Sequence, residues 1–214
     1  IAAQQGRFEE SVRLAKEAVE VAVEFNLTSL RLTASINQAS SLFHLQCYEE
    51  ALSIYREVRW RAERVGIQRE YRLALQGVAR TLADLGEFDQ AEGVFNELFE
   101  CAQAQGLDAA AIAALHDVGI CQRERGRSAE ARQTWGRAIR RARATGDTEW
   151  LFRCRLANAL SWEEERDTDK SLRKIRRYAN LEARKDEPVV AARLWYSYAT
   201  RLEASNGDAP EVDK

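Results

Sequence analysis

The sequence has no methionine, only two prolines and only two histidines in 214 residues. Because proline breaks helices, its shortage leaves long helical stretches possible along nearly the whole chain. Two isolated histidines do not make a metal site, and we expect His44 and His116 to be structural or surface residues. The chain opens on Ile1 without a methionine, so we expect it to be a piece of a longer protein.

Long apolar runs and paired cysteines are also missing. No run approaches the roughly 18 apolar residues that span a membrane, and residues 1–7 lack the apolar core of a signal peptide. We therefore expect a cytoplasmic protein without a membrane partner. The cysteines form no Cys-x-x-Cys pair and have no histidine at zinc-ligand spacing, which predicts reduced thiols and no metal. They are Cys47, Cys101, Cys121 and Cys154.

Motifs of catalysis are absent as well. The sequence has no glycine-rich loop between a strand and a helix, no nucleophile elbow and no His-Glu-x-x-His. The run Glu163-Glu164-Glu165 ends a predicted helix and points around its circumference, so these carboxylates do not converge. We expect a protein that is not an enzyme and that uses no cofactor.

The formal net charge is −2, which gives no general attraction to nucleic acid or membranes. Residues 1–107 carry 11 basic and 16 acidic side chains, whereas residues 108–214 carry 21 and 18. Two basic clusters fall on predicted second helices, namely Arg137, Arg140, Arg141, Arg143 and Arg173, Lys174, Arg176, Arg177. A solvated outer face explains them better than a nucleic-acid footprint.

What the chain does contain is an internal repeat. The stretch Gly86-Glu87-Phe88-Asp89-Gln90-Ala91 combines a turn, an aromatic residue and a small residue, and Gly106 follows as a helix stop. The pattern recurs about 40 residues apart, and self-similarity at a fixed period indicates a repeat protein. The related turns are Gly6-Arg7-Phe8, Cys47-Tyr48, Gly126 and Arg166, and the stops are Asn26, Gly66, Gly106, Gly146 and Asp186.

Apolar residues at helical spacing predict ten helices joined by loops of two or three residues. Such short loops force successive helices to lie antiparallel. Thr28, Asp108 and Ser128 are predicted N-caps, and Pro188 suits the first turn of a helix. The expected helices are residues 8–25, 28–45, 48–65, 68–85, 88–105, 108–125, 128–145, 148–165, 168–185 and 188–204.

Alignment on this period places a small residue at one position of each helix in a pair, so that two backbones can approach closely. The first helices carry Ala39, Ala79, Gly119, Ala159 and Ala199, and the second carry Ser11, Ala51, Ala91, Ala131 and Ser171. Four residues later the second helices mostly carry a large group that fills the space beside this contact. These residues are Ala15, Tyr55, Phe95, Trp135 and Ile175.

This pattern resembles the tetratricopeptide repeat. That repeat has a small residue in the first helix, then a glycine before an aromatic residue, an alanine three residues later and an aromatic residue four further on. The resemblance covers nearly the whole chain, with about 40 residues per repeat against the usual 34. It resembles the long-repeat branch of the family, which is found in kinesin light chains, LGN-type polarity scaffolds, ciliary assembly proteins and bacterial regulators of the Rap and MalT-like kind. It implies an all-α fold, an α-α superhelix (TPR solenoid) of antiparallel helix pairs.

This resemblance sets the expected domain organisation. We expect one solenoid over residues 1–205 and a disordered tail over residues 206–214. The expected repeats are 1–26 (partial), 27–66, 67–106, 107–146, 147–186 and 187–205 (partial).

In this family the first helices line a concave groove that ligands commonly occupy. The resemblance therefore implies partner-binding residues at Ser40, His44, Gln76, Arg80, Asp84, His116, Arg123, Arg153 and Tyr196. The Lys and Asn pair with which chaperone-binding members hold a C-terminal carboxylate is absent, because Ile36/Ser40 and Gln76/Arg80 stand at those positions. Arg80, Arg123 and Arg153 would still suit an acidic segment, since guanidinium groups pair with carboxylates; solvated charges are the alternative.

Two functions follow from this reading. The first is a non-catalytic protein–protein interaction scaffold that binds a peptide or helical segment of a partner in the concave groove. The alternative is a ligand- or peptide-sensing regulatory domain of a larger transcriptional or signalling protein. We expect a protein or peptide partner, for which acidic character would suit the arginines, and no nucleic acid. The sequence leaves the oligomeric state open.

Overall fold

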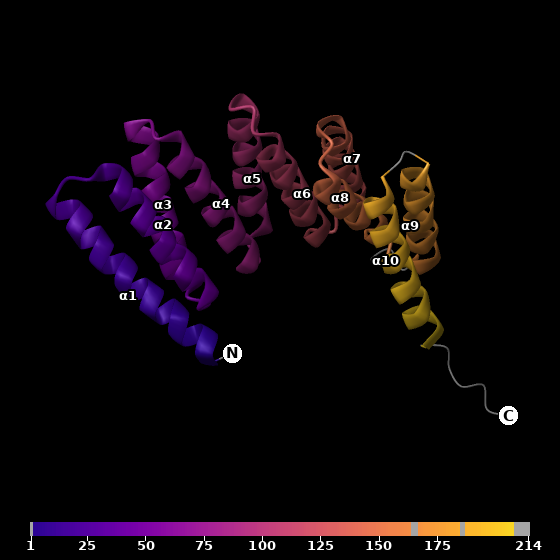
Figure 1. The fold of residues 1–214 in the computed structure, drawn as a ribbon, viewed down its shortest axis with the longest axis horizontal. Helices are drawn as coiled ribbons and strands as arrows, with labels where there is room; N and C mark the ends of the chain where they lie inside the picture. Colours follow the sequence, from indigo (N-terminus) through magenta and orange to yellow (C-terminus); the bar gives the residue numbers. More distant parts are fainter. Residues whose placement is uncertain (1, 164–166, 185–186, 208–214) are drawn as a thin grey trace. The chain divides into compact units, whose positions relative to one another are not determined.

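The computed structural model describes residues 2–163, 167–184 and 187–207, which form α-helices joined by short turns and contain no strand (Figure 1). The helices are α1 (Ala2–Glu24), α2 (Thr28–His44), α3 (Tyr48–Val65), α4 (Gln68–Asp84), α5 (Phe88–Ala104), α6 (Asp108–Glu124), α7 (Ser128–Thr145), α8 (Thr148–Leu160), α9 (Thr168–Ala183) and α10 (Pro188–Gly207). From α2 to α10 each helix begins 20 residues after the one before, so a hairpin recurs every 40 residues. The predicted all-α fold and its period are confirmed.

The helices belong to two compact units, Ile1–Gly106 with α1–α5 and Leu107–Lys214 with α6–α10. Within the first unit each helix packs against the next, and α2 also packs against α4. Within the second unit the same holds, and α8 packs against both α6 and α10. Each unit is therefore a stack of antiparallel hairpins whose first helices are neighbours, which is the packing of a helical solenoid. The division falls at the predicted boundary between repeats 67–106 and 107–146.

Left-handed residues close the helices where the sequence predicts stops. The φ angles are +54° at Asn26, +72° at Gly66, +67° at Gly106 and +69° at Gly146. At Gly66, for example, the amide donates to the carbonyl oxygen of Glu63 at 3.2 Å, which satisfies a carbonyl of the last turn. The predicted turn at Arg166 and the predicted stop at Asp186 lie outside the described residues.

The predicted N-caps are wrong. Thr28, Asp108 and Ser128 are each the first helical residue, and the caps before them are Leu27, Leu107 and Arg127, without a side-chain hydrogen bond. The turn is so short that Leu27 already occupies the cap position, and its carbonyl oxygen accepts the first hydrogen bond of α2, from the amide of Arg31 at 2.9 Å. Side-chain caps occur instead at α8 and α9, where Asp147 and Asp167 accept from the amides of Trp150 and Lys170.

Three helix ends also differ from the sequence-based prediction. The turn expected at Gly6 is absent because α1 continues through it; a helical glycine costs only about 1 kcal/mol, less than breaking the helix would. Helix α8 ends at Leu160, because the last turn tightens and the amide of Glu163 donates to Leu160 at 2.9 Å. Helix α10 extends to Gly207, so residues 206 and 207 of the predicted tail are helical, and residues 208–214 lie outside the described part.

The small positions make the close helix contacts that the alignment predicts. Ala39, Ala79, Ala159, Ala51, Ala91, Ala131 and Ser171 have no exposed surface. The large residues four positions on, Tyr55, Phe95, Trp135 and Ile175, are buried beside them. Two aligned positions differ: Ala199 is exposed and Ser11 is only half-buried.

Replacing Ala91 by leucine should destabilise the protein by roughly 1–3 kcal/mol, because the added methylenes enter a contact without free space. Urea denaturation measures the change. The exposed neighbour Gln90 is the control, and Gln90→Leu should change stability by about 0.5 kcal/mol or less. Equal midpoints for both variants would show that Ala91 is not at a helix–helix contact.

Candidate functional site

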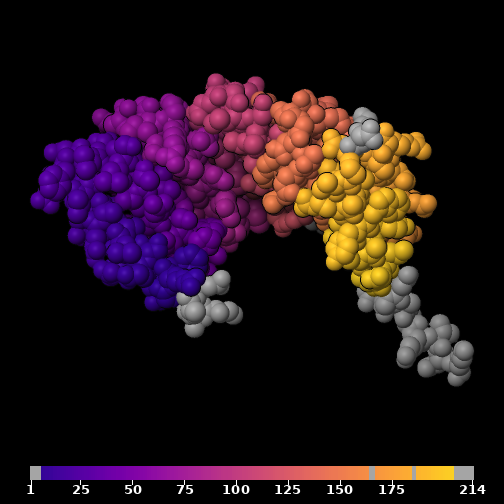
Figure 2. Space-filling model, viewed as in Figure 1, coloured from indigo at the N-terminus to yellow at the C-terminus, as the bar shows by residue number. Residues whose placement is uncertain are grey.

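A cavity of about 300 Å³ opens between α2 and α4 of the first unit. Its lining combines amides, hydroxyls, one histidine and one arginine with apolar side chains. The residues are Ile36, Asn37, Ser40, Phe43 and His44 from α2, Tyr55 from α3, and Leu73, Gln76, Gly77 and Arg80 from α4. In Figure 2 the atoms of neighbouring helices within the first unit are packed together, so the cavity is defined by its lining residues and not by the gaps between ribbons.

The floor of this cavity is the ring of Tyr55, which is 6% exposed. A Cβ atom on Gly77 would lie 2.4 Å from the Cε1 atom of Tyr55, so only glycine leaves room for the ring. Burial raises the pKa of the Tyr55 hydroxyl, and a hydrogen bond with Ser40 and the charge of Arg80 oppose this rise. The hydroxyl therefore stays protonated at neutral pH.

The rim of the cavity is aromatic and cationic. The guanidinium carbon of Arg80 lies 5.5 Å from the centre of the Phe43 ring. His44 stacks on Phe8 of α1 with ring centres 4.7 Å apart. Asn37 and Gln76 present exposed amides. A segment lying across this rim would meet hydrogen-bond donors and acceptors together with one permanent positive charge.

A second hollow, of about 410 Å³, lies between α1 and α2, and Asn37 belongs to both linings. Its other residues include Arg7, Glu10 and Thr33. The hydroxyls of Ser11 and Ser41 are 2.8 Å apart and link the two helices. Asn37 therefore borders both hollows of the first unit, one between α1 and α2 and the other between α2 and α4.

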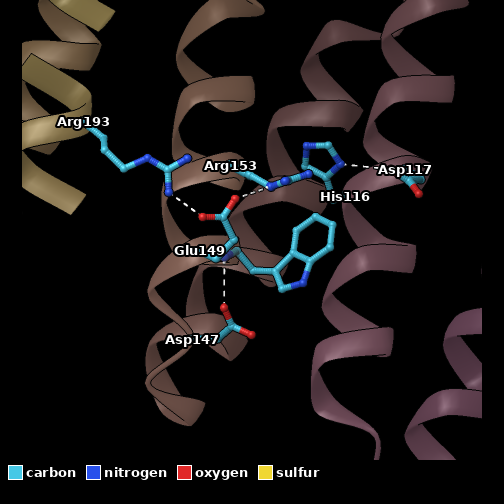
Figure 3. A network of polar contacts seen from close by, with 7 residues as sticks. His116, Asp117, Asp147, Glu149, Arg153 and Arg193 are labelled. Carbon is cyan, nitrogen blue, oxygen red and sulfur yellow. Dashed lines mark hydrogen bonds and ion pairs between the residues drawn. The ribbon is translucent and has the colours of Figure 1, made fainter. Parts of the chain in front are cut away.

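The second unit carries a network of polar contacts on α6, α8 and α10 (Figure 3). Glu149 accepts from the Nε atom of Arg153 at 2.6 Å and also forms an ion pair with Arg193. These two arginines, Arg193 first, lower the pKa of Glu149 to about 2. The carboxylate stays ionised and holds α8 against α10.

Aromatic rings lie beside this network. The ring of His116 is 5.4 Å from that of Trp150, and its Nδ1 atom is 3.0 Å from the carboxylate of Asp117. The guanidinium carbon of Arg153 lies 5.2 Å from the centre of the Trp150 ring. That of Arg193 lies 3.9 Å from the centre of a phenyl ring of α8. Each arginine is thus held by a carboxylate and a ring.

The predicted site residues fall into separate groups. Ser40, His44, Gln76 and Arg80 line one cavity, and Asp84 lies exposed outside that lining. In the second unit His116 and Arg153 belong to the network of Figure 3. Arg123 pairs with Glu124 at 2.5 Å, and Tyr196 is 73% exposed.

Sequence reasoning missed several contributors, among them Asn37, Gly77, Glu149 and Arg193. Asn37 precedes Ser40 by three residues and Gly77 follows Gln76, and a full helix face would have included both. Glu149 precedes Arg153 by four residues, the spacing of a helical ion pair, so it was detectable. Arg193 was not, because only tertiary packing brings it to Glu149.

Among the residues that the structure describes, no helix is long and apolar enough to cross a membrane. The same residues contain no group of three or more His, Cys, Asp or Glu side chains arranged to hold a metal ion.

Known proteins are similar to this chain in sequence pattern and in three-dimensional structure. The family profile of the tetratricopeptide repeat matches residues 30–104. No match was found among curated proteins. Residues 30–104 therefore belong to the tetratricopeptide-repeat family, and both units consist of the helix hairpins that define its fold.

Three solved structures have the same fold over most of the chain. A Rap protein complexed with Competence and Sporulation Factor is 16% identical, with a TM-score of 0.65 over 94% of this chain and 60% of its own. A putative kinesin light chain from Podosopora anserina is 14% identical, with a TM-score of 0.71 over 85% and 90%. BtubC (BKLC) from P. vanneervenii is 12% identical, with a TM-score of 0.66 over 97% and 95%. This chain thus spans less than two thirds of the Rap protein.

Proposed function

We propose that this chain is a non-catalytic interaction module that binds a peptide or helical segment of a partner protein, with the cavity between α2 and α4 as a principal contact. The observation that carries the proposal is the convergence of Ser40, Gln76 and Arg80 over the buried ring of Tyr55. A volume of about 300 Å³ is at the lower end for ligand sites, which suits one or two side chains of a longer segment.

The lining has the chemistry that a polypeptide needs. The amides of Asn37 and Gln76 both donate and accept, as a peptide backbone requires. Ile36 and Leu73 offer apolar contact. Arg80 adds a charge that favours an acidic side chain in the bound segment.

Further contacts are proposed for the remaining predicted residues. These are His44 and Asp84 in the first unit, and His116, Arg123, Arg153 and Tyr196 in the second. Arg153 has to leave Glu149 before it can bind a partner, so an acidic segment would compete there with the chain's own carboxylate.

The second candidate function is a sensing domain in which a bound peptide changes the packing of hairpins and thereby controls an attached domain. The similar Rap protein, which was solved as a complex with Competence and Sporulation Factor, supports this candidate. Hydrogen exchange separates the two functions: a sensor should show slowed exchange over all of α1–α5 when the peptide binds, and a simple scaffold only beside the cavity.

A peptide display experiment tests the binding site. Random 12-residue peptides are selected on the parent chain, and the enriched sequences are synthesised and measured by calorimetry. The triple variant Asn37→Ala, Gln76→Ala, Arg80→Ala should bind them at least about tenfold more weakly, a loss of about 1.4 kcal/mol. Its melting should stay close to the parent's, because all three side chains are exposed.

The control variant removes the same residue types from second helices of the same unit, as Arg56→Ala, Gln90→Ala, Asn96→Ala. These positions are also exposed, and affinity should stay within about twofold of the parent's. Enriched peptides that bind the cavity variant as tightly as the parent, or a selection that enriches nothing, would overturn the proposal.

A further inference from the structure

Helix α9 carries a stripe of cationic side chains on its exposed face. Arg173, Arg176 and Arg177 of the helix and its C-cap residue Arg184 are all exposed, and with Asn180 and Leu181 they line a shallow hollow of about 430 Å³. Arg173, Arg177, Leu181 and Arg184 follow one another at spacings of four, four and three residues, so the stripe runs along one side of the helix for about 16 Å.

The opposite side of α9 is buried. Leu172, Ile175, Ala179 and Glu182 face the interior of the unit, where α9 packs against α8 and α10. The cationic stripe is thus on the side that these two helices leave open.

The arginines of this stripe differ from most others in their unit. Within the described residues, none of Arg173, Arg176, Arg177 and Arg184 forms an ion pair. By contrast, ion pairs hold Arg123, Arg127, Arg141, Arg143, Arg153, Arg155, Arg193 and Arg201. A shortage of carboxylates does not explain the difference, since the chain has 34 Asp and Glu for 32 Lys and Arg.

Collecting like charges on one helix face costs stability. Arg173 and Arg177 are four residues apart, where like charges repel by about 0.2–0.5 kcal/mol. The neighbouring Lys174 experiences the same field: burial lowers its pKa, and Arg177, Arg132 and Lys170 lower it further. A face that retains this repulsion is suited to a partner that neutralises it.

The nearby aromatic rings argue against a single-stranded nucleic acid as that partner. Trp162 is covered by Arg132 at 3.7 Å and by Lys170 at 3.4 Å from its ring centre. Tyr178 lies beneath Arg155, at 4.8 Å. Because the chain's own cations occupy these rings, they offer no platform on which bases could stack.

We propose that the exposed face of α9 is a docking surface for an acidic α-helical segment of a partner protein. Carboxylates of that segment pair with Arg173, Arg177 and Arg184, and an apolar side chain rests on Leu181. A helix fits because its own side chains repeat every three or four residues, which matches the stripe, and because planar guanidinium groups bind carboxylates bidentately. The surface belongs to the second unit alone and does not depend on the cavity between α2 and α4.

Two synthetic helical peptides test the proposal. The first carries glutamates at positions i, i+4, i+7 and i+11 with one leucine among them, and the second carries glutamine at the same four positions. Fluorescence anisotropy at low salt should detect binding of the glutamate peptide, at least tenfold tighter than the glutamine peptide. The triple variant Arg173→Gln, Arg177→Gln, Arg184→Gln should lose this preference, and added salt should weaken binding by the parent.

The control variant Arg56→Gln, Arg64→Gln, Arg69→Gln removes the same charge from the first unit and should bind as the parent does. A 12-nucleotide single strand and a 12-base-pair duplex serve as competing probes. Equal binding of the two peptides, or equal loss in both variants, would overturn the proposal. Tighter binding of either oligonucleotide, lost only in the α9 variant, would overturn it in favour of a nucleic-acid surface.

Discussion

Replacing Glu182 by alanine should destabilise the protein by roughly 3–5 kcal/mol, the usual cost of leaving a buried charge without its partner. Glu182 is fully buried and forms an ion pair with Arg155, which is 1% exposed. Arg143 also donates to the Glu182 carboxylate, at 2.5 Å. Burial lowers the pKa of Arg155 and the charge of Glu182 opposes this, but a guanidinium does not deprotonate at accessible pH. Without Glu182 its charge stays in the core.

Urea denaturation followed by circular dichroism measures this effect. The matched control is Glu149→Ala, which removes an exposed carboxylate that also holds two arginines and should cost about 1 kcal/mol or less. The double variant Arg155→Met, Glu182→Leu should recover most of the stability, since apolar residues often replace a buried pair without loss. If Glu182→Ala melts like Glu149→Ala, the buried pair is not the link between α8 and α9.

Replacing Trp135 by alanine should cost roughly 3–5 kcal/mol, because this side chain has no exposed surface and its removal leaves a large cavity. The variant also loses the hydrogen bond that the indole Nε1 donates to the carbonyl oxygen of His116 at 3.0 Å. The ring occupies the place where Gly119 lacks a side chain, and a Cβ atom there would lie 2.4 Å from Nε1. Thermal or urea denaturation gives the value.

A double-mutant cycle sharpens this test. Gly119→Ala should destabilise the parent by about 1–3 kcal/mol through overpacking, yet have little effect in the Trp135→Ala background, where the ring is gone. Gly93→Ala is the control: a Cβ atom there meets nothing within 4 Å, and the helix should gain up to about 1 kcal/mol. Additive losses for Trp135 and Gly119 would contradict the contact.

The sequence predicts the fold well because its signals are local and repeated. Glycines at positions that require a positive φ, such as Gly66 and Gly106, mark helix ends whatever surrounds them. Small residues such as Ala91 recur at the same position of successive repeats, which indicates that two helices pack closely there. The prediction of the N-caps failed although Thr28 and Ser128 are residue types that commonly cap helices. Because the turn is short, each lies one residue inside its helix.

The candidate site could be predicted only in part. Ser40 and Gln76 meet in one cavity because first helices of successive hairpins are neighbours, a consequence of the repeat period that the sequence carries. The pair of Glu149 with Arg153 lies within α8 and was detectable from its spacing, whereas the pair of Glu149 with Arg193 was decided by the packing of α8 against α10. The pairing of Arg155 with Glu182 has the same origin.

The sequence by itself thus determined the elements, their spacing and which helices are neighbours, because turn chemistry and hydrophobic period act over a few residues. Tertiary structure decided which charged side chains are paired and which are left open. The arginines of the α9 stripe show this most clearly. They are the same residue type as the paired arginines of the unit, and only the placement of the carboxylates leaves Arg173, Arg177 and Arg184 facing outward. Pairing between side chains of different helices depends on the distances between those helices, which no local pattern encodes.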